Sequence, residues 1–131
     1  MSEKISFDAL LPPEMAVKAE ELGVRKAKMD AGRLFLLAVL AGAFIAIGAL
    51  FATTVSSAGA DAALPYGITR LVAGLAFSTG LILVVVGGAE LFTGNNLIVM
   101  AFASGDVTMR MLLRNWVIVY GGNFVGSVAT A

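Results

Sequence analysis

The sequence contains no cysteine and no histidine. The lack of cysteine excludes disulfides, thiolate nucleophiles and cysteine-based metal sites, and the lack of histidine excludes imidazole acid–base catalysis and most zinc or haem ligation. Charge is also scarce: 14% of the 131 residues are charged, where an average soluble domain has about 25%. Nine basic and nine acidic residues balance, so no net field draws the chain to nucleic acid. These absences predict a protein that is not an enzyme, holds no metal or other cofactor and has no nucleic-acid partner.

Hydrophobic residues and glycine dominate the chain instead. Hydrophobic residues make up 59% of it, its mean hydropathy is +0.92, and it contains 15 glycines. The run of 22 uncharged residues at 34–55 spans about 33 Å as a helix, enough to cross a lipid bilayer. In that run Ala38, Gly42 and Ala46 recur every four residues, so a neighbouring helix can approach this small face closely. We therefore predict an all-α membrane protein with spans at residues 34–55, 71–103 and, incompletely, 115–131.

The first 33 residues have an ordinary mixed charge and no uncharged core, so they do not form a secretory signal peptide. Pro12 and Pro13 followed by Glu14 are typical of a helix start. The helix that follows has an apolar face, which Lys26 interrupts. We predict that residues 1–33 hold an amphipathic helix on the cytoplasmic membrane surface; a solvated tail helix is the alternative.

The basic residues predict the orientation of the spans. Six of the nine precede residue 34, and Arg110 and Arg114 lie in a predicted polar loop at 104–114, whereas Arg70 alone follows the first span. Because basic residues gather on the cytoplasmic side, the N-terminus is expected in the cytoplasm, and the chain in the cytoplasmic (inner) membrane as a multi-pass protein. The polar connection at 56–69 is then expected outside, with a turn at Pro65.

The second span is interrupted near residues 87–96, where glycine, asparagine and one acidic residue replace the apolar run. Each unpaired backbone group in lipid costs several kcal/mol, so such a break survives only where it is buried in protein or lines a cavity. We expect a half-helix to restart after Asn96, with the positive end of its dipole toward the break, which favours an anion there.

Polar residues of the break are candidate ligands of that anion. Glu90 is the one ionisable residue at membrane depth, which indicates either a functional role or a carboxylate that caps exposed backbone N–H groups. Thr93 and Asn95 offer neutral hydrogen-bonding groups that contact a small anion without holding it by full charge.

Bulky apolar residues flank these polar groups. Phe77 and Leu81 lie one helical turn apart, and Leu91 and Phe92 lie within the break. Apolar side chains above and below a polar pocket form constrictions that strip water from a permeant. Ordinary helix packing is the alternative interpretation of the pair at positions 77 and 81.

Several stretches resemble the formate/nitrite transporter family of small-anion channels. The central one is Val-Gly-Gly-Ala-Glu-Leu-Phe-Thr-Gly at residues 86–94. Residues 11–16 resemble the N-terminal helix of the family, residues 41–45 its first span, and residues 115–120 with Gly122 and Asn123 its third. The similar stretches follow one another in the family's order and cover essentially the whole chain.

This resemblance implies an aquaporin-like fold, with six spans in two inverted three-span repeats. It further implies a homopentamer with a pore in each protomer that passes small monovalent anions such as formate or nitrite, in some members with proton coupling. By resemblance, Phe77 belongs to an outer constriction, and Leu81, Leu91 and Phe92 to an inner one. Thr93 is then expected in the loop between them, facing a central histidine of the second repeat.

The sequence departs from that pattern in two ways, because it has no histidine and no second repeat. We therefore expect it to be a fragment, the N-terminal half of such a transporter. A water channel of the aquaporin type is disfavoured, since Asn95-Asn96-Leu97 lacks the proline of an Asn-Pro-Ala turn. A three-helix membrane assembly subunit without transport activity remains as the second hypothesis.

Overall fold

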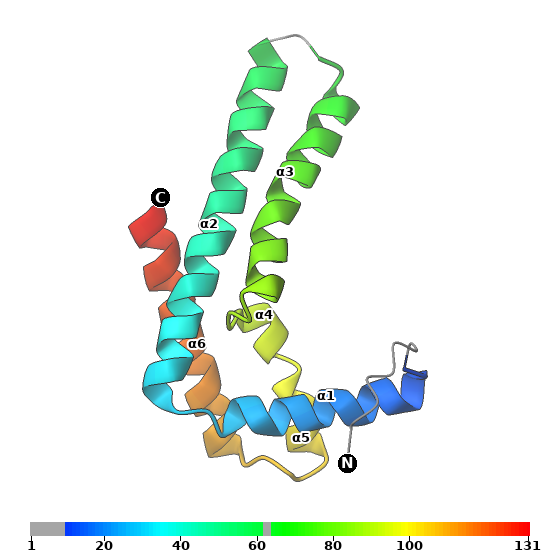
Figure 1. Cartoon of the computed structure of the whole chain (residues 1–131), viewed down its shortest axis with the longest axis vertical. Helices are drawn as coiled ribbons and strands as arrows, with labels where there is room; N and C mark the ends of the chain where they lie inside the picture. The colour runs from blue at the N-terminus through cyan, green and yellow to red at the C-terminus, as the bar shows by residue number, and fades with distance from the viewer. Residues whose placement is uncertain (1–9, 62–63) are drawn as a thin grey trace, which may run out of the picture.

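The computed structural model describes residues 10–61 and 64–131 and is helical throughout, with no strand in those ranges. This confirms the predicted all-α class. Two helices flank a third that is longer than either, and a shorter helix crosses their base (Figure 1). The elements are α1 (Pro12–Ala27), α2 (Ala31–Asp61), α3 (Tyr66–Val86), α4 (Phe92–Asn95), α5 (Ile98–Ala103) and α6 (Met109–Thr130).

Small residues bring α2 close to both of its neighbours. A Cβ atom added at Gly48 meets the backbone oxygen of Phe77 at 2.8 Å, and one added at Gly80 meets Phe44 O at 2.7 Å, so glycine is required on both sides of the α2–α3 contact. On the other side of α2, a Cβ added at Gly122 of α6 meets Ala38 Cβ at 2.5 Å, and one at Gly42 collides with the backbone of Asn123. The predicted small face of the first span therefore packs against α6.

The connection after the first span is much shorter than the polar composition of residues 56–69 predicts. Helix α2 continues to Asp61, α3 begins at Tyr66 with Pro65 as its N-cap, and residues 62–63 lie outside the described ranges. The reason is local, since Thr53, Thr54 and Ser56 donate their hydroxyls to the carbonyl oxygens four residues earlier at 2.8 Å. Because these hydroxyls form hydrogen bonds within α2, the polar residues continue the helix and do not end it.

The predicted loop at 104–114 is also wrong in its second half, because α6 begins at Met109. The Thr108 hydroxyl accepts from Met111 N at 3.4 Å and caps the helix start. Leu112 is buried, and Arg114 Nη1 donates to Met29 O at 3.1 Å. Arg110 and Arg114 thus lie on the first turns of α6, and contacts with residues distant in sequence, such as Met29, hold this end of the helix.

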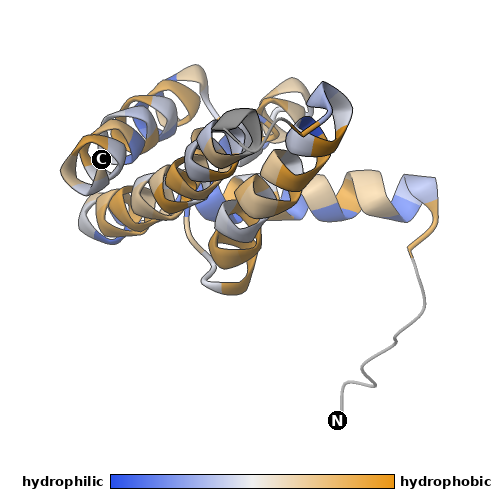
Figure 2. Cartoon of the chain, turned by 90° about the horizontal axis from the view of Figure 1, so that it is seen from above, coloured by the Kyte–Doolittle hydropathy of each residue, from blue (hydrophilic) through white to orange (hydrophobic). Residues whose placement is uncertain are grey.

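Helix α1 begins at Pro12, as predicted, with Glu14 Oε2 accepting from Leu11 N at 3.0 Å. It packs on α5 and α6, with Gly23 and Ala27 buried, which argues against the alternative of a solvated tail. Ala27 joins a core cluster with Ile98 and Leu112. Figure 2 shows hydrophilic and hydrophobic residues alternating along α1. Residues 1–9 of the predicted N-terminal region lie outside the described residues.

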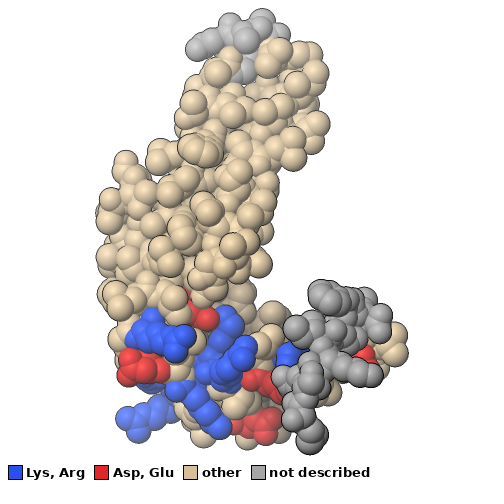
Figure 3. All heavy atoms as spheres, in the orientation of Figure 1, with Lys and Arg blue, Asp and Glu red and all other residues tan. Residues whose placement is uncertain are grey.

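Within the described part of the chain, two segments are long and apolar enough to cross a membrane, Ala31–Ala58 and Tyr66–Val86. On the face drawn in Figure 3, every charged side chain lies at the end of the molecule that carries α1. The long apolar part of α2 and α3 shows none on that face. This separation of charged and apolar ends fits a protein embedded in a bilayer.

Candidate functional site

The candidate site is the irregular segment between α3 and α4, at residues 87–91. Helix α3 ends at Val86, and Gly88 has φ 60°, a left-handed conformation that glycine adopts without strain. Ala89 N donates to Val84 O at 3.0 Å, and Glu90 N donates across to Leu37 O of α2 at 3.1 Å. The break thus finds its backbone partners in protein, which is the condition for irregular backbone at membrane depth.

Asn123 of α6 holds the end of this break. Its Nδ2 donates to Ala38 O at 2.8 Å and to Glu90 O at 2.9 Å, while its Oδ1 accepts from Phe92 N at 2.8 Å. One side-chain amide therefore connects α2, the break and the start of α4. The sequence analysis gave Asn123 no role. The signal that could have revealed it is a polar asparagine beside Gly122 in an otherwise apolar helix.

Glu90 forms an ion pair with α1. Lys26 Nζ lies 2.7 Å from Glu90 Oε2 and 3.0 Å from Asn95 Oδ1. The Glu90 side chain is 7% exposed and that of Lys26 28%, so the pair is largely withdrawn from solvent. Among the described residues the carboxylate binds Lys26 and no backbone N–H, which differs from the capping alternative. The lysine that interrupts the apolar face of α1 is thus the residue that reaches the break.

Asn95 belongs to the same buried network. Its Nδ2 donates to Asn115 Oδ1 at 2.9 Å, and Asn115 Nδ2 donates to Lys26 O at 3.0 Å. Trp116 Nε1 donates to Asn95 O at 3.1 Å. Asn95 and Asn115 have no exposed surface, and both amides have protein partners. Three elements (α1, α4 and α6) are joined through these contacts.

The restart of the helix differs from the prediction. Helix α4 begins at Phe92 instead of after Asn96, and the N–H of Phe92 is taken by Asn123. The helical N-terminus that directly follows the break is therefore at Phe92, and a second short helix, α5, begins at Ile98. Thr93, in the first turn of α4, is exposed.

The apolar candidates lie in two places. Phe77 and Leu81 are 40% and 47% exposed on α3. The ring of Phe92 makes edge-on contacts with Trp116 and Tyr120 of α6, with centroid distances of 6.1 and 5.6 Å. Leu91 packs against a cluster formed by Ala41, Val84 and Ala89.

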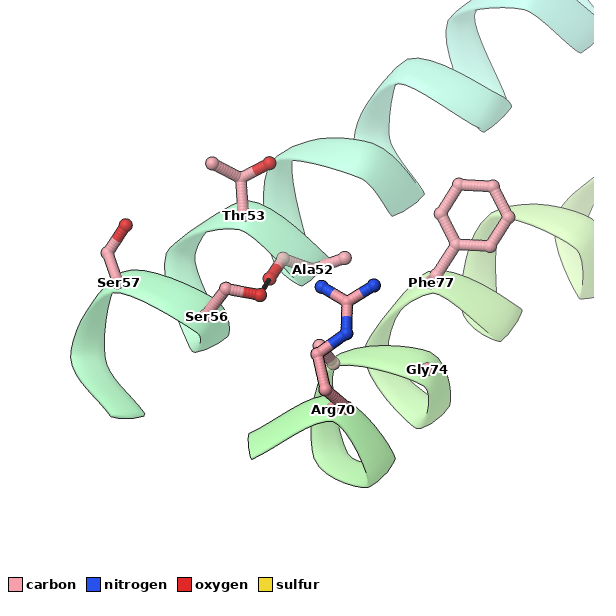
Figure 4. A pocket seen from close by; sticks show the side chains of 8 residues that line it. Ala52, Thr53, Ser56, Ser57, Arg70, Gly74 and Phe77 are labelled. Atoms are coloured by element: carbon pink, nitrogen blue, oxygen red, sulfur yellow. Dashed lines mark hydrogen bonds between the residues drawn. The ribbon is translucent and has the colours of Figure 1, made fainter. Parts of the chain in front are cut away.

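A groove of about 600 Å³ opens between α2 and α3, toward the end of the molecule opposite α1. It is lined by Arg70 and Phe77 of α3 and by Thr53, Ser56 and Ser57 of α2 (Figure 4). It is therefore a mixed polar and apolar surface, with one basic side chain.

The sequence match to known proteins covers nearly the whole chain. The family model described as formate/nitrite transporter matches residues 13–131. The chain belongs to the formate/nitrite transporter family. This confirms the resemblance drawn from residues 86–94, and it places the chain among membrane channels and transporters, which are not enzymes.

Relatives in the family come from bacteria and an archaeon. The formate channel FocA of Escherichia coli K12 is 48% identical over 122 residues, which are 93% of this chain and 42% of that protein. FocA of Haemophilus influenzae is 42% identical over 130 residues, 99% of this chain and 45% of the relative. A probable formate transporter of Methanothermobacter thermautotrophicus is 38% identical over 121 residues, 92% and 44% of the two chains. The chain thus spans less than half the length of each.

Proposed function

We propose that this chain forms part of a pathway for small monovalent anions such as formate or nitrite across the cytoplasmic membrane, with or without a coupled proton. One observation carries the proposal: the break in the second span is held by Asn123, Lys26 and Leu37, while Thr93 beside it stays exposed. A fixed break beside an exposed hydroxyl suits brief contact with a permeant. The relatives named formate channel support the anion class.

The proposed assembly follows from the family. The chain supplies the first of two inverted three-span repeats with an aquaporin-like arrangement, five protomers associate, and each protomer has its own pore. Helix α1, with its basic residues, lies on the cytoplasmic side, as the predicted orientation requires. A domain division at residue 33 separates this helix from the membrane repeat at 34–131.

Within the pore we assign Phe77 to the outer constriction, and Leu81, Leu91 and Phe92 to the inner one. Thr93 contacts the anion between them. An anion that enters an apolar constriction loses hydration at a large cost, which a neutral donor offsets in part without trapping the ion. Glu90 and Asn95, which the sequence interpretation also placed at the anion, are assigned to holding the break through Lys26.

The test is formate uptake into liposomes that contain the gene product purified from its native membrane. Thr93→Val removes the hydroxyl at nearly constant volume, and we expect formate flux to fall about tenfold, the effect of one lost transition-state contact of about 1.4 kcal/mol. Thr54→Val is the matched control, since the Thr54 hydroxyl is bonded within α2 to Leu50 O.

Two results would contradict the proposal at different levels. Unchanged flux in correctly assembled Thr93→Val protein removes Thr93 from the pore. Wild-type protein that passes neither formate nor nitrite overturns the transport function and favours a membrane assembly subunit without transport.

A further inference from the structure

The exposed face at the start of α6 combines two arginines with an apolar surface. Arg110 and Arg114 are four residues apart, so they lie on neighbouring turns of one face. Leu113 and Val117 share that face and are 48% and 72% exposed. These side chains line a groove of about 600 Å³, whose lining residues are Met109, Arg110, Leu113, Arg114, Val117 and Ile118. The groove is therefore cationic at the start of the helix and apolar beyond it.

The position of α6 in the fold places this groove at the edge of the apolar region. Arg114 donates to Met29 O just after α1, so the arginines lie at the end of the molecule that carries α1 (Figure 1). A Cβ at Gly122 meets Ala38 Cβ, which puts α6 against α2, a segment long and apolar enough to cross a membrane. In a bilayer the arginines then lie at the level of the lipid headgroups.

The apolar part of the exposed face has the length of one lipid leaflet. No charged residue occurs from position 115 to 131. Leu113, Val117 and Phe124 are exposed on one side of α6. From residue 113 to 124 the helix rises about 16 Å, which is about half of the 30 Å hydrocarbon core of a typical bilayer. An acyl chain that starts at the arginines therefore meets apolar side chains throughout its leaflet.

Arg110 has no partner of its own in the described part of the chain. The ion pairs of that part do not include it, whereas Arg114 Nη1 donates to Met29 O at 3.1 Å. Arg110 lies in the first turn of α6, where the positive end of the helix dipole disfavours a cation. Like charges four residues apart on a helix also repel each other. An anion beside Arg110 relieves both effects.

We infer that this face of α6 binds an anionic phospholipid, with the lipid phosphate on Arg110 and an acyl chain along Leu113 and Val117. The planar guanidinium offers paired N–H donors that match phosphate oxygens. A free phosphate leaves the apolar strip unoccupied. A second copy in the same membrane orientation brings its own arginines to the same depth, where like charges oppose contact. The inference requires a chain embedded in a bilayer and does not depend on the transported anion.

The experiment compares an anionic with a zwitterionic lipid. The gene product purified from its native membrane is depleted of lipid in detergent and titrated with dioleoyl phosphatidylglycerol or dioleoyl phosphatidylcholine. Native mass spectrometry measures the bound lipid. We expect Arg110→Gln to bind the phosphatidylglycerol about tenfold more weakly than wild type, because one charge-assisted contact is lost. Binding of the phosphatidylcholine should change much less.

Three further variants make the result specific. Lys28→Gln removes an exposed cation that lies outside this groove and should keep the wild-type affinity. Arg110→Lys keeps the charge but not the paired donors, so its affinity should fall between those of wild type and Arg110→Gln. Leu113→Ser shortens the apolar strip and should weaken both lipids alike. Thermal unfolding in lipid-free detergent checks that each variant is folded, and Leu113→Ser tests the site even where Arg110→Gln is not.

Three results overturn the inference. The first is equal affinity of wild type and Arg110→Gln for the phosphatidylglycerol. The second is displacement of that lipid by an equal concentration of glycerol 3-phosphate, which would make this a site for a free phosphate. The third is a wild type that binds both lipids equally, as expected where another protein segment or a second copy covers the face. Formate uptake is measured separately, so none of these results decides the proposed function.

Discussion

The ammonium group of Lys26 lies 2.7 Å from Glu90 Oε2, although 64 residues separate the two side chains. This contact fastens the surface helix α1 to the broken span. Removal of one member of a largely buried pair leaves an uncompensated charge, which is costly, whereas removal of both members costs much less. The pair therefore makes the position of the break depend on α1.

We expect Lys26→Met to lower the free energy of unfolding by about 3 kcal/mol, because Glu90 is then buried without a partner. The double variant Lys26→Met/Glu90→Gln should recover at least half of that loss. Thermal unfolding in detergent measures both. Lys18→Met is the control, since its pair with Glu21 is exposed and should be worth less than about 1 kcal/mol. Additive losses in the double variant would contradict the pairing.

Asn123→Asp keeps an acceptor for Phe92 N but replaces the two N–H donors by a carboxylate facing carbonyl oxygens. We expect a loss of about 3 kcal/mol in unfolding free energy, from two broken hydrogen bonds and the oxygens left unsatisfied. Hydrogen exchange of residues 87–92 should rise before that of α2. The exposed Asn96→Asp is the control. Equal effects of the two variants would show that Asn123 does not hold the break.

Glycines of α6 differ in what surrounds them. A Cβ at Gly126 collides with the backbone of Val39, whereas Gly121 has nothing within 4 Å. Gly126→Ala should therefore destabilise the protein by about 2 kcal/mol through overpacking. Gly121→Ala should be neutral or up to about 1 kcal/mol more stable, because alanine favours the helix. Thermal unfolding midpoints of the two variants test this prediction. A lower midpoint for Gly121→Ala than for Gly126→Ala would contradict the close contact of α2 and α6.

Asp30 caps the start of α2 from outside the predicted span. Its Oδ2 accepts from Gly32 N at 2.9 Å and Arg33 N at 3.1 Å. The N–H of Arg33, and next that of Gly32, hold the pKa of Asp30 below its usual value of 3.8. A carboxyl whose pKa is lowered by folding stabilises the protein above the unfolded pKa, and that contribution disappears as pH falls through the folded pKa.

Asp30→Ala should accordingly lower the unfolding midpoint at pH 7, and the difference from wild type should shrink below the usual pKa of 3.8. Asp106→Ala is the control, because Asp106 is exposed and its side chain makes no hydrogen bond among the described residues. A difference between wild type and Asp30→Ala that stays constant from pH 7 to acid would show that ionised Asp30 is not the cap.

Helix class and close packing follow from local sequence. The uncharged run at 34–55 and the small residues Ala38 and Gly42 are readable without a structure, because apolar length and small side chains act on neighbouring positions. The ends of the helices were harder to predict from the sequence. Ser56 and Arg110 look like loop residues by composition, but one bonds inside α2 and the other precedes a buried Leu112.

The features of the candidate site also fall into two groups, those predictable from the sequence and those that depend on the tertiary structure. Sequence alone determined the glycine-rich interruption and the apolar residues that flank its polar groups, since composition and spacing carry them. Only the tertiary structure decided that Glu90 pairs with Lys26, that Asn123 bonds three elements, and that Phe92 packs on α6. These partners lie dozens of residues apart, and the energy of a polar contact depends on which chain segments folding brings within about 3 Å of each other.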